Sequence, residues 1–206
     1  MELTERQNDS VTELINIAFS RAAASLSDLT GHRVLLDVPQ VSLYLISELP
    51  IKLAKFLPAE IATVHQVFSG PLAGDALLLL NYDGAVMLTE LLTDEHPQSK
   101  RLDESAREVL TEVGNILLNA CLGVFGNLLQ VRVSFSVPHL HLEALGEVIN
   151  SLIEDKNEVR YALVIYTAFR LRDSAVSGYL IIALSVASLD RLIREVELWE
   201  QRQENE

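Results

Sequence analysis

Residues 9–16 read DSVTELIN, and residues 108–115 read EVLTEVGN. The two stretches align without a gap, and in each of them a glutamate is followed three positions later by an asparagine. A proline stands 23 positions after each asparagine. The three positions recur at a constant offset of 99: Glu13 and Glu112, Asn16 and Asn115, Pro39 and Pro138. A repeat that keeps its register over this length predicts a chain built of two related halves.

The order of the predicted elements repeats as well. Apolar residues at helical or strand spacing, punctuated by Pro and Gly, indicate in each half a long helix, a strand broken by a proline, a short helical segment, a strand pair and a closing helix. The predicted helices are 5–29, 50–58 (helical or irregular), 84–92, 102–129, 143–154 and 189–199, and the predicted strands are 32–46, 61–68, 75–81, 131–142, 159–172 and 175–185. We therefore expect an α/β (α+β) fold, a single domain of two repeats, about 1–97 and 98–206.

Composition excludes several classes of function. The chain has 206 residues, 49% of them hydrophobic, which is enough for a sizeable core. It carries 16 Lys and Arg against 29 Asp and Glu, a formal net charge of −13. Because phosphates repel such a charge, we expect no non-specific binding to nucleic acid or to an anionic membrane. The polar start MELTERQNDS and the short apolar runs predict a soluble, cytoplasmic protein without a membrane span. The polar tail 200–206 is expected to fray.

Metal and redox chemistry find little support in the sequence. The single cysteine, Cys121, lies among apolar residues and is interpreted as a core residue, because one cysteine forms neither an internal disulfide nor a multi-cysteine zinc site. His139, His141 and Glu143 alternate and would share one face of a strand, a spacing that permits metal ligation. The same alternation is expected of any strand with one solvated face, so we predict no metal site.

Helical spacing places the repeated polar residues in two stripes, one on each long helix. The stripes are Asp9, Glu13, Asn16 and Ser20 on the first helix, and Glu108, Glu112, Asn115 and Asn119 on the second. Two acidic residues four positions apart repel each other, and asparagine is a weak helix former, so a merely solvated face would be better served by Lys or Gln. The stripes therefore favour a functional surface.

At these residues the sequence resembles the CheC/CheX/FliY family of chemotaxis response-regulator phosphatases. The family motif is Asp or Ser, three residues, Glu, two residues, Asn, 22 residues and Pro. The stretch from Asp9 to Pro39 meets every position, and the second copy meets all but the first, where Glu108 stands. The family usually has Gly before the Asn; Gly114 keeps it, whereas Ile15 replaces it and is expected to add bulk beside the inserted amide.

The resemblance spans nearly the whole chain, and two intact Glu/Asn pairs resemble the CheC branch. It implies a pseudo-two-fold fold in which two long helices display the sites and pack on an antiparallel β-sheet. The implied substrate is the aspartyl-phosphate of a CheY-like receiver, which itself supplies Mg²⁺ and a lysine. Asn16 and Asn115 would position the attacking water, as a glutamine does in small GTPases. Glu13 and Glu112 would pair with the receiver's lysine, and Asp9 and Glu108 would extend the contact. A CheD-type partner is also compatible with the family, although no residue maps to it.

Two further questions stay open at the level of sequence. The same helix faces would suit a non-catalytic adaptor that binds a response regulator or a flagellar or chemotaxis component. Trp199, the single tryptophan, would either close the core or anchor a partner or a second copy, so both a monomer and a homodimer are compatible with the sequence.

Overall fold

The computed structural model describes residues 3–57, 60–93, 102–128, 130–154, 160–171 and 174–204. Its centre is an eight-stranded sheet in which every pairing is antiparallel. The strands are β1 (Val34–Leu36), β2 (Gln40–Leu45), β3 (Glu60–Ser69), β4 (Gly74–Asn81), β5 (Ser134–Phe135), β6 (His139–Ala144), β7 (Arg160–Leu171) and β8 (Ser174–Ser185). Their order is β1-β7-β8-β4-β3-β5, with β2 also pairing β7 and β6 also pairing β3.

The sheet order is symmetric with respect to the two halves of the sequence. The hairpins β3–β4 and β7–β8 lie side by side at the centre, joined through β4 and β8. The first two strands of each half pair with the hairpin of the other half, β1 and β2 with β7, and β5 and β6 with β3. This exchange explains why the two halves share one sheet and both contribute to the core on each of its faces.

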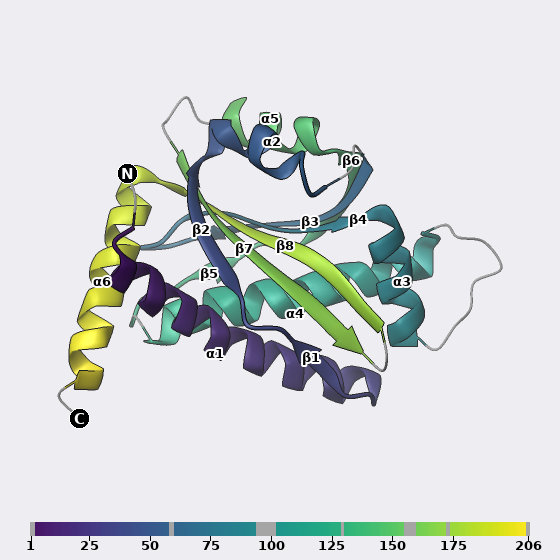
Figure 1. The fold of residues 1–206 in the computed structure, drawn as a ribbon, viewed down its shortest axis with the longest axis horizontal. Helices are drawn as coiled ribbons and strands as arrows, with labels where there is room; N and C mark the ends of the chain where they lie inside the picture. Colours follow the sequence, from purple (N-terminus) through teal and green to yellow (C-terminus); the bar gives the residue numbers. More distant parts are fainter. Residues whose placement is uncertain are drawn as a thin grey trace.

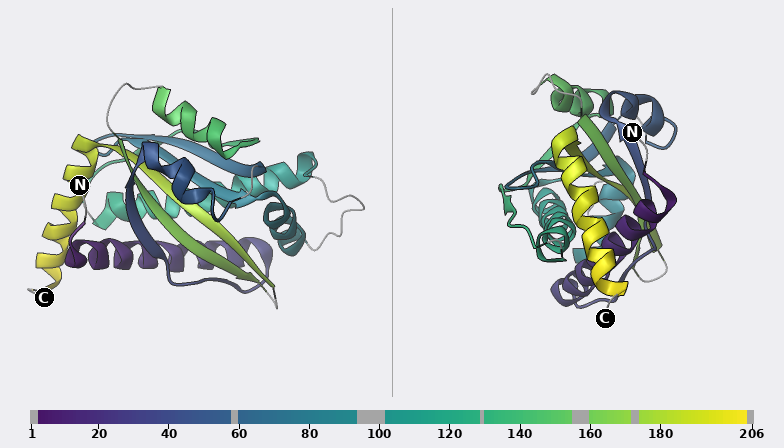
Figure 2. Two further views of the ribbon diagram at one scale, coloured as in Figure 1. Left: turned by 45° about the horizontal axis from the view of Figure 1, so that its top comes forward. Right: turned by 90° about the vertical axis from the view of Figure 1, so that its left-hand side faces the viewer.

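Helices cover both faces of the sheet (Figures 1 and 2). The helices are α1 (Glu5–Thr30), α2 (Leu49–Leu53), α3 (Tyr82–Thr93), α4 (Glu104–Leu128), α5 (Leu145–Glu154) and α6 (Val186–Glu204), with a 3-10 turn at Ile46–Glu48 before α2. On one face α1 and α4 run side by side, flanked by α3 and α6, whereas α2 and α5 lie on the other. Successive leucines of β4 therefore face different cores, Leu78 toward α1 and α4 and Leu77 toward α2 and α5. Burial on both faces is why this strand reads as a continuous apolar run.

The two long predicted helices are confirmed. Thr4 caps the start of α1, where its hydroxyl accepts from the Gln7 backbone and the Gln7 side chain accepts from the Thr4 backbone. Gly31 ends the helix in the left-handed conformation at φ 68°, which glycine adopts without strain. Between them an apolar stripe that includes Leu14 and Ala18 is fully buried, as the helical spacing of its apolar residues indicates.

Helix α6 extends further than the sequence predicts. The tail from residue 200 was expected to fray, yet the helix continues to Glu204; residues 205–206 lie outside the described part of the chain. The reason is a polar contact with the start of α1. Arg6 Nε donates to Glu200 Oε1 at 2.8 Å, and Gln7 Nε2 donates to Glu197 Oε1 at 2.8 Å. Trp199, half-buried, packs against the core on the α1 and α4 side, which supports its interpretation as a core-closing residue.

Helix α4 is the core helix of the second half. In the described residues it is the one helix whose length and composition would allow it to cross a membrane, and half of its most apolar window is buried inside the protein. Cys121 is fully buried in it, and desolvation raises the pKa of its thiol far above the usual range. The thiol is therefore kept neutral, in agreement with a core role. The predicted boundary between the repeats at 93–100 lies almost entirely outside the described residues.

Candidate functional site

Both polar stripes lie on the outer faces of the long helices. In the first stripe Asp9 and Glu13 are exposed and Asn16 is half-buried. The second stripe repeats this gradient, with Glu108 and Glu112 exposed and Asn115 half-buried. Each glutamate thus stands one helical turn from a half-buried asparagine. Such a pair can present a charge and an amide to the same partner.

The second site is hydrogen-bonded along its length. Asn115 Nδ2 lies 3.5 Å from Glu112 Oε2, at the limit of a hydrogen bond, and Asn119 Nδ2 donates to Asn115 Oδ1 at 2.6 Å. In the first site Ser20 Oγ instead donates to the backbone carbonyl of Asn16 at 2.9 Å. Asn16 lies at one end of an open groove of about 360 Å³ between α1 and β1. The structure therefore brings each predicted pair together, but it supports the two asparagines differently.

The position before each asparagine faces the core, which corrects one expectation. Ile15 is 0% exposed and packs in the core, so it adds no bulk to the surface beside Asn16. Helical geometry explains this, because a residue two positions after Glu13 points to nearly the opposite side of the helix. In the second copy Gly114 is also buried, and a Cβ there would lie 2.5 Å from Val64 Cγ1 on β3. The usual Gly of the motif is here a packing feature rather than a feature of the exposed face.

This close approach predicts the effect of a single methyl group. Gly114→Ala should lower stability by about 1–2 kcal/mol, because overpacking against Val64 costs more than the improved helix propensity returns. The matched control is Gly123→Ala on the same helix, where a Cβ meets nothing within 4 Å, and which should raise stability by about 0.5–1 kcal/mol. Urea unfolding of both variants measures the difference; equal shifts for the two would contradict the packing argument.

The alternating residues of β6 lie as the sequence predicts. Leu140 and Leu142 pack against the core shared with α4, while His139, His141 and Glu143 lie on the other face of the strand. His141 Nδ1 is 3.6 Å from Glu143 Oε1. Within the described ranges, no three His, Cys, Asp or Glu side chains are grouped so that they could hold a metal ion.

A buried polar cluster on the face of the sheet that bears α2 and α5 escaped the sequence analysis. Arg160 is 3% exposed and donates to Asp75 Oδ2, to the Leu152 carbonyl at 3.1 Å and to the Ala183 carbonyl at 3.1 Å. His65 Nε2 lies 3.0 Å from Asp75 Oδ1. Burial opposes the charge on Asp75, but the hydrogen bonds from His65 and Arg160 prevail and lower its pKa. The signal in the sequence is Asp75, an aspartate at the start of an apolar strand. The cluster connects α5 to the sheet and contains no residue of the two polar stripes.

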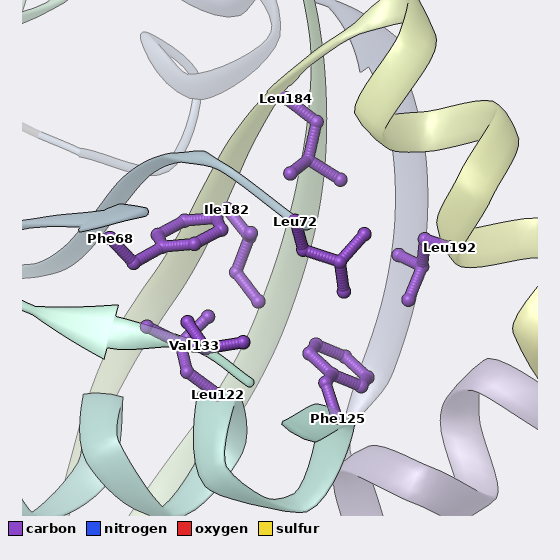
Figure 3. A pocket seen from close by; sticks show the side chains of 8 residues that line it. All are labelled: Phe68, Leu72, Leu122, Phe125, Val133, Ile182, Leu184 and Leu192. Atoms are coloured by element: carbon purple, nitrogen blue, oxygen red, sulfur yellow. The ribbon is translucent and has the colours of Figure 1, made fainter. Parts of the chain in front are cut away.

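A small apolar cavity lies between α4, α6 and the sheet (Figure 3). It measures about 10 Å³ and is lined by Phe68, Leu72, Leu122, Phe125, Val133, Ile182, Leu184 and Leu192. This volume is close to the smallest that can hold one water molecule, and the lining side chains offer it no polar partner. The cavity is therefore a packing gap without room for a ligand. The exposed helix faces remain the candidate site.

Known proteins resemble this chain in sequence and in fold. No family model matches the chain. The CheY-P phosphatase CheC of Bacillus subtilis (strain 168) is 24% identical over 170 residues, 81% of this chain and 81% of that protein. The crystal structure of FliY from Thermotoga maritima matches with a TM-score of 0.76 at 18% identity, covering 98% of this chain and 99% of that one. FliM of H. pylori, solved in a complex with FliG, matches with a TM-score of 0.66 at 13% identity, covering 93% and 100%.

The fold is thus the CheC-like one, a curled antiparallel sheet with two long helices on one face. The 24% identity to CheC over 81% of the chain, together with the repeated Glu/Asn pairs, supports the resemblance to the CheC/CheX/FliY family.

Proposed function

We propose that this protein is a phosphatase that hydrolyses the aspartyl-phosphate of a CheY-like response regulator. The observation that carries the proposal is the pair of Glu-x2-Asn motifs, each with an exposed glutamate and a half-buried asparagine on an adjacent long helix. The similarity to CheC, a CheY-P phosphatase, supports the same activity.

The chemistry asks little of the enzyme beyond positioning. An acyl phosphate is already reactive, and in this proposal the receiver brings its own Mg²⁺ and lysine. The amide of Asn16 or Asn115 enters the receiver's site and orients a water molecule in line with the phosphorus–oxygen bond that breaks, so that the water's oxygen replaces the aspartyl oxygen. The amide contributes orientation through one donor and one acceptor, and the proton of the water leaves with the product phosphate.

The glutamates determine how the helix docks. Glu13 or Glu112 pairs with the receiver's lysine, and this charge-assisted contact one turn away sets the depth to which the amide is inserted. Asp9 and Glu108, one turn further and exposed, add contacts at the rim of the interface. The acidic character of both stripes suits a partner with a basic residue at its reacting centre. We place this reaction in the cytoplasm, with one receiver bound at each helix.

A time course of a phosphorylated receiver, with and without the protein, tests the proposal. Phosphatase activity predicts that the label is lost faster in proportion to the protein added. Screening several receivers in this way also identifies the substrate.

A non-catalytic adaptor is the second candidate. The matching FliM structure was solved in a complex with FliG, so this fold also occurs in a protein that assembles with another. If the same helix faces bind a receiver or a flagellar or chemotaxis component tightly and the decay of the phosphorylated receiver is not accelerated, the adaptor function is favoured.

A further inference from the structure

Three amide side chains form a hydrogen-bonded line from the sheet to the surface of α4. The line begins at Gln66 on β3, which is 2% exposed. Its Nε2 donates to the Ser136 carbonyl at 2.8 Å and to Asn119 Oδ1 at 3.3 Å. Asn119 Nδ2 donates to Asn115 Oδ1 at 2.6 Å, and Asn115 Nδ2 points to Glu112. The line therefore ends at the amide that the proposed reaction uses.

The buried end of this line fixes the direction of every bond in it. A backbone carbonyl only accepts, so Gln66 must turn its nitrogen toward Ser136. Rotating the Gln66 amide by half a turn would place its oxygen against the Ser136 carbonyl and Asn119 Oδ1, two acceptors. Gln66 Oε1 is buried without a hydrogen-bond partner among the described residues, so the orientation is set by the two donated bonds alone. Asn119 and Asn115 must then follow the same direction.

The described residues of the first half form no such line. Asp37 stands 99 positions before Ser136, and its carbonyl accepts from Thr167 Oγ1 at 3.0 Å, the contact that corresponds to the one made by Gln66. A threonine hydroxyl has a single hydrogen, which this bond uses, so Thr167 cannot also donate to α1. Ser20 stands where α4 has Asn119, and it bonds to the backbone of α1 instead.

We propose that Gln66 and Asn119 are positioning residues of the second site, which hold the Asn115 amide in one orientation. This inference rests on the proposed function. Asn115 Oδ1 keeps a second lone pair and Nδ2 a second hydrogen, so the held amide still binds a water molecule. The second site is thereby preorganised, because the orientation of its amide is fixed before the receiver binds, whereas Asn16 must be ordered at that moment. The two sites are unequal, and the second has the larger kcat.

The kinetic test uses proteins with one working site. In an Asn16→Ala background only the second site acts, and Gln66→Met removes both donated bonds with a side chain of similar length that suits the core. We expect kcat to fall roughly tenfold, with KM and the Kd for the receiver unchanged, because the docking residues are untouched. The matched control is Thr167→Val in an Asn115→Ala background, which removes the corresponding bond of the first half and should leave kcat unchanged.

A second readout does not depend on activity. Side-chain ¹⁵N relaxation of the full chain should give a higher order parameter for the Asn115 amide than for that of Asn16. In Gln66→Met the Asn115 value should fall to that of Asn16, while the backbone spectrum shows a folded protein. Equal order parameters in the wild-type protein, or an unchanged kcat in Gln66→Met, would overturn the inference. If wild type fails to hydrolyse any phosphorylated receiver, the proposed function fails instead, and the relaxation data still decide whether the amide is held.

Discussion

Replacing Asn16 and Asn115 together by alanine should reduce the accelerated dephosphorylation of a receiver by roughly 100-fold or more, to the level of the receiver alone. Alanine removes the amide that orients the water and leaves the glutamates that dock the helix. Either single replacement should leave the other site working. The measurement is the rate of loss of phosphoryl label from the receiver, with the binding of the receiver to each variant determined in parallel.

The fold should tolerate this change, because both asparagines are half-buried and alanine is the better helix former. A matched control replaces Asn8 and Asn127, which lie on the same two helices outside the stripes, and this variant should keep the wild-type rate. A double Asn16/Asn115 variant that still hydrolyses the receiver at the wild-type rate would exclude the proposed mechanism. A variant that binds the receiver normally and no longer hydrolyses it would support it.

Arg160→Met should destabilise the protein by about 3–5 kcal/mol, a large share of the free energy of unfolding of a domain of this size. The substitution leaves the carboxylate of Asp75 buried, with His65 as its one side-chain partner among the described residues, and it removes the donors to the Leu152 and Ala183 carbonyls. The matched control is Arg170→Met. Arg170 lies on β7 like Arg160, but its ion pair with Asp37 is exposed, so its loss should change stability little. Urea unfolding at neutral pH compares the two.

The pH dependence of this stability difference shows whether the loss in Arg160→Met comes from an unpaired charge or from lost packing. In the wild-type protein the pKa of Asp75 is lowered, so its contribution to stability is present above the unfolded-state pKa and is lost as the pH falls through the folded-state value. Without Arg160, its hydrogen bond and its charge no longer lower the pKa of Asp75, so this pKa is expected to be higher in the variant than in the wild type and the carboxylate is neutralised at a higher pH. The gap between wild type and Arg160→Met should therefore shrink as the pH is lowered. A gap that stays constant would assign the loss to packing.

The sequence predicts the elements well because their signals are local. The apolar stripe of α1 and the proline-broken strands follow from helical and strand spacing, and both are found in the structure. The exposure of Glu13 and Glu112 follows from the same spacing. The burial of Ile15 also follows from this spacing, because Ile15 belongs to the apolar stripe of its helix.

The remaining features depend on contacts between distant residues. Gln66 lies 53 positions from Asn119 and 70 from Ser136, and nothing in its local sequence distinguishes it from any other polar residue of a strand. The Asp75–Arg160 pair spans 85 positions. The pairing of each half's first strands with the opposite hairpin likewise depends on tertiary packing. A strand pairs in the register that buries its apolar side chains, and this depends on residues far away in the sequence. The helical end at Glu204 depends on contacts of Glu197 and Glu200 with α1 side chains that lie 190 and 194 positions away in the sequence.

The exchanged strands of the sheet also bear on how the chain assembles. Either half by itself would leave an unfilled edge beside its own hairpin, because the strands that cover this edge come from the other half. If the two halves were separate molecules, their assembly would depend on their concentration. Because both belong to one polypeptide, the exchange of strands is an intramolecular event that proceeds at any dilution.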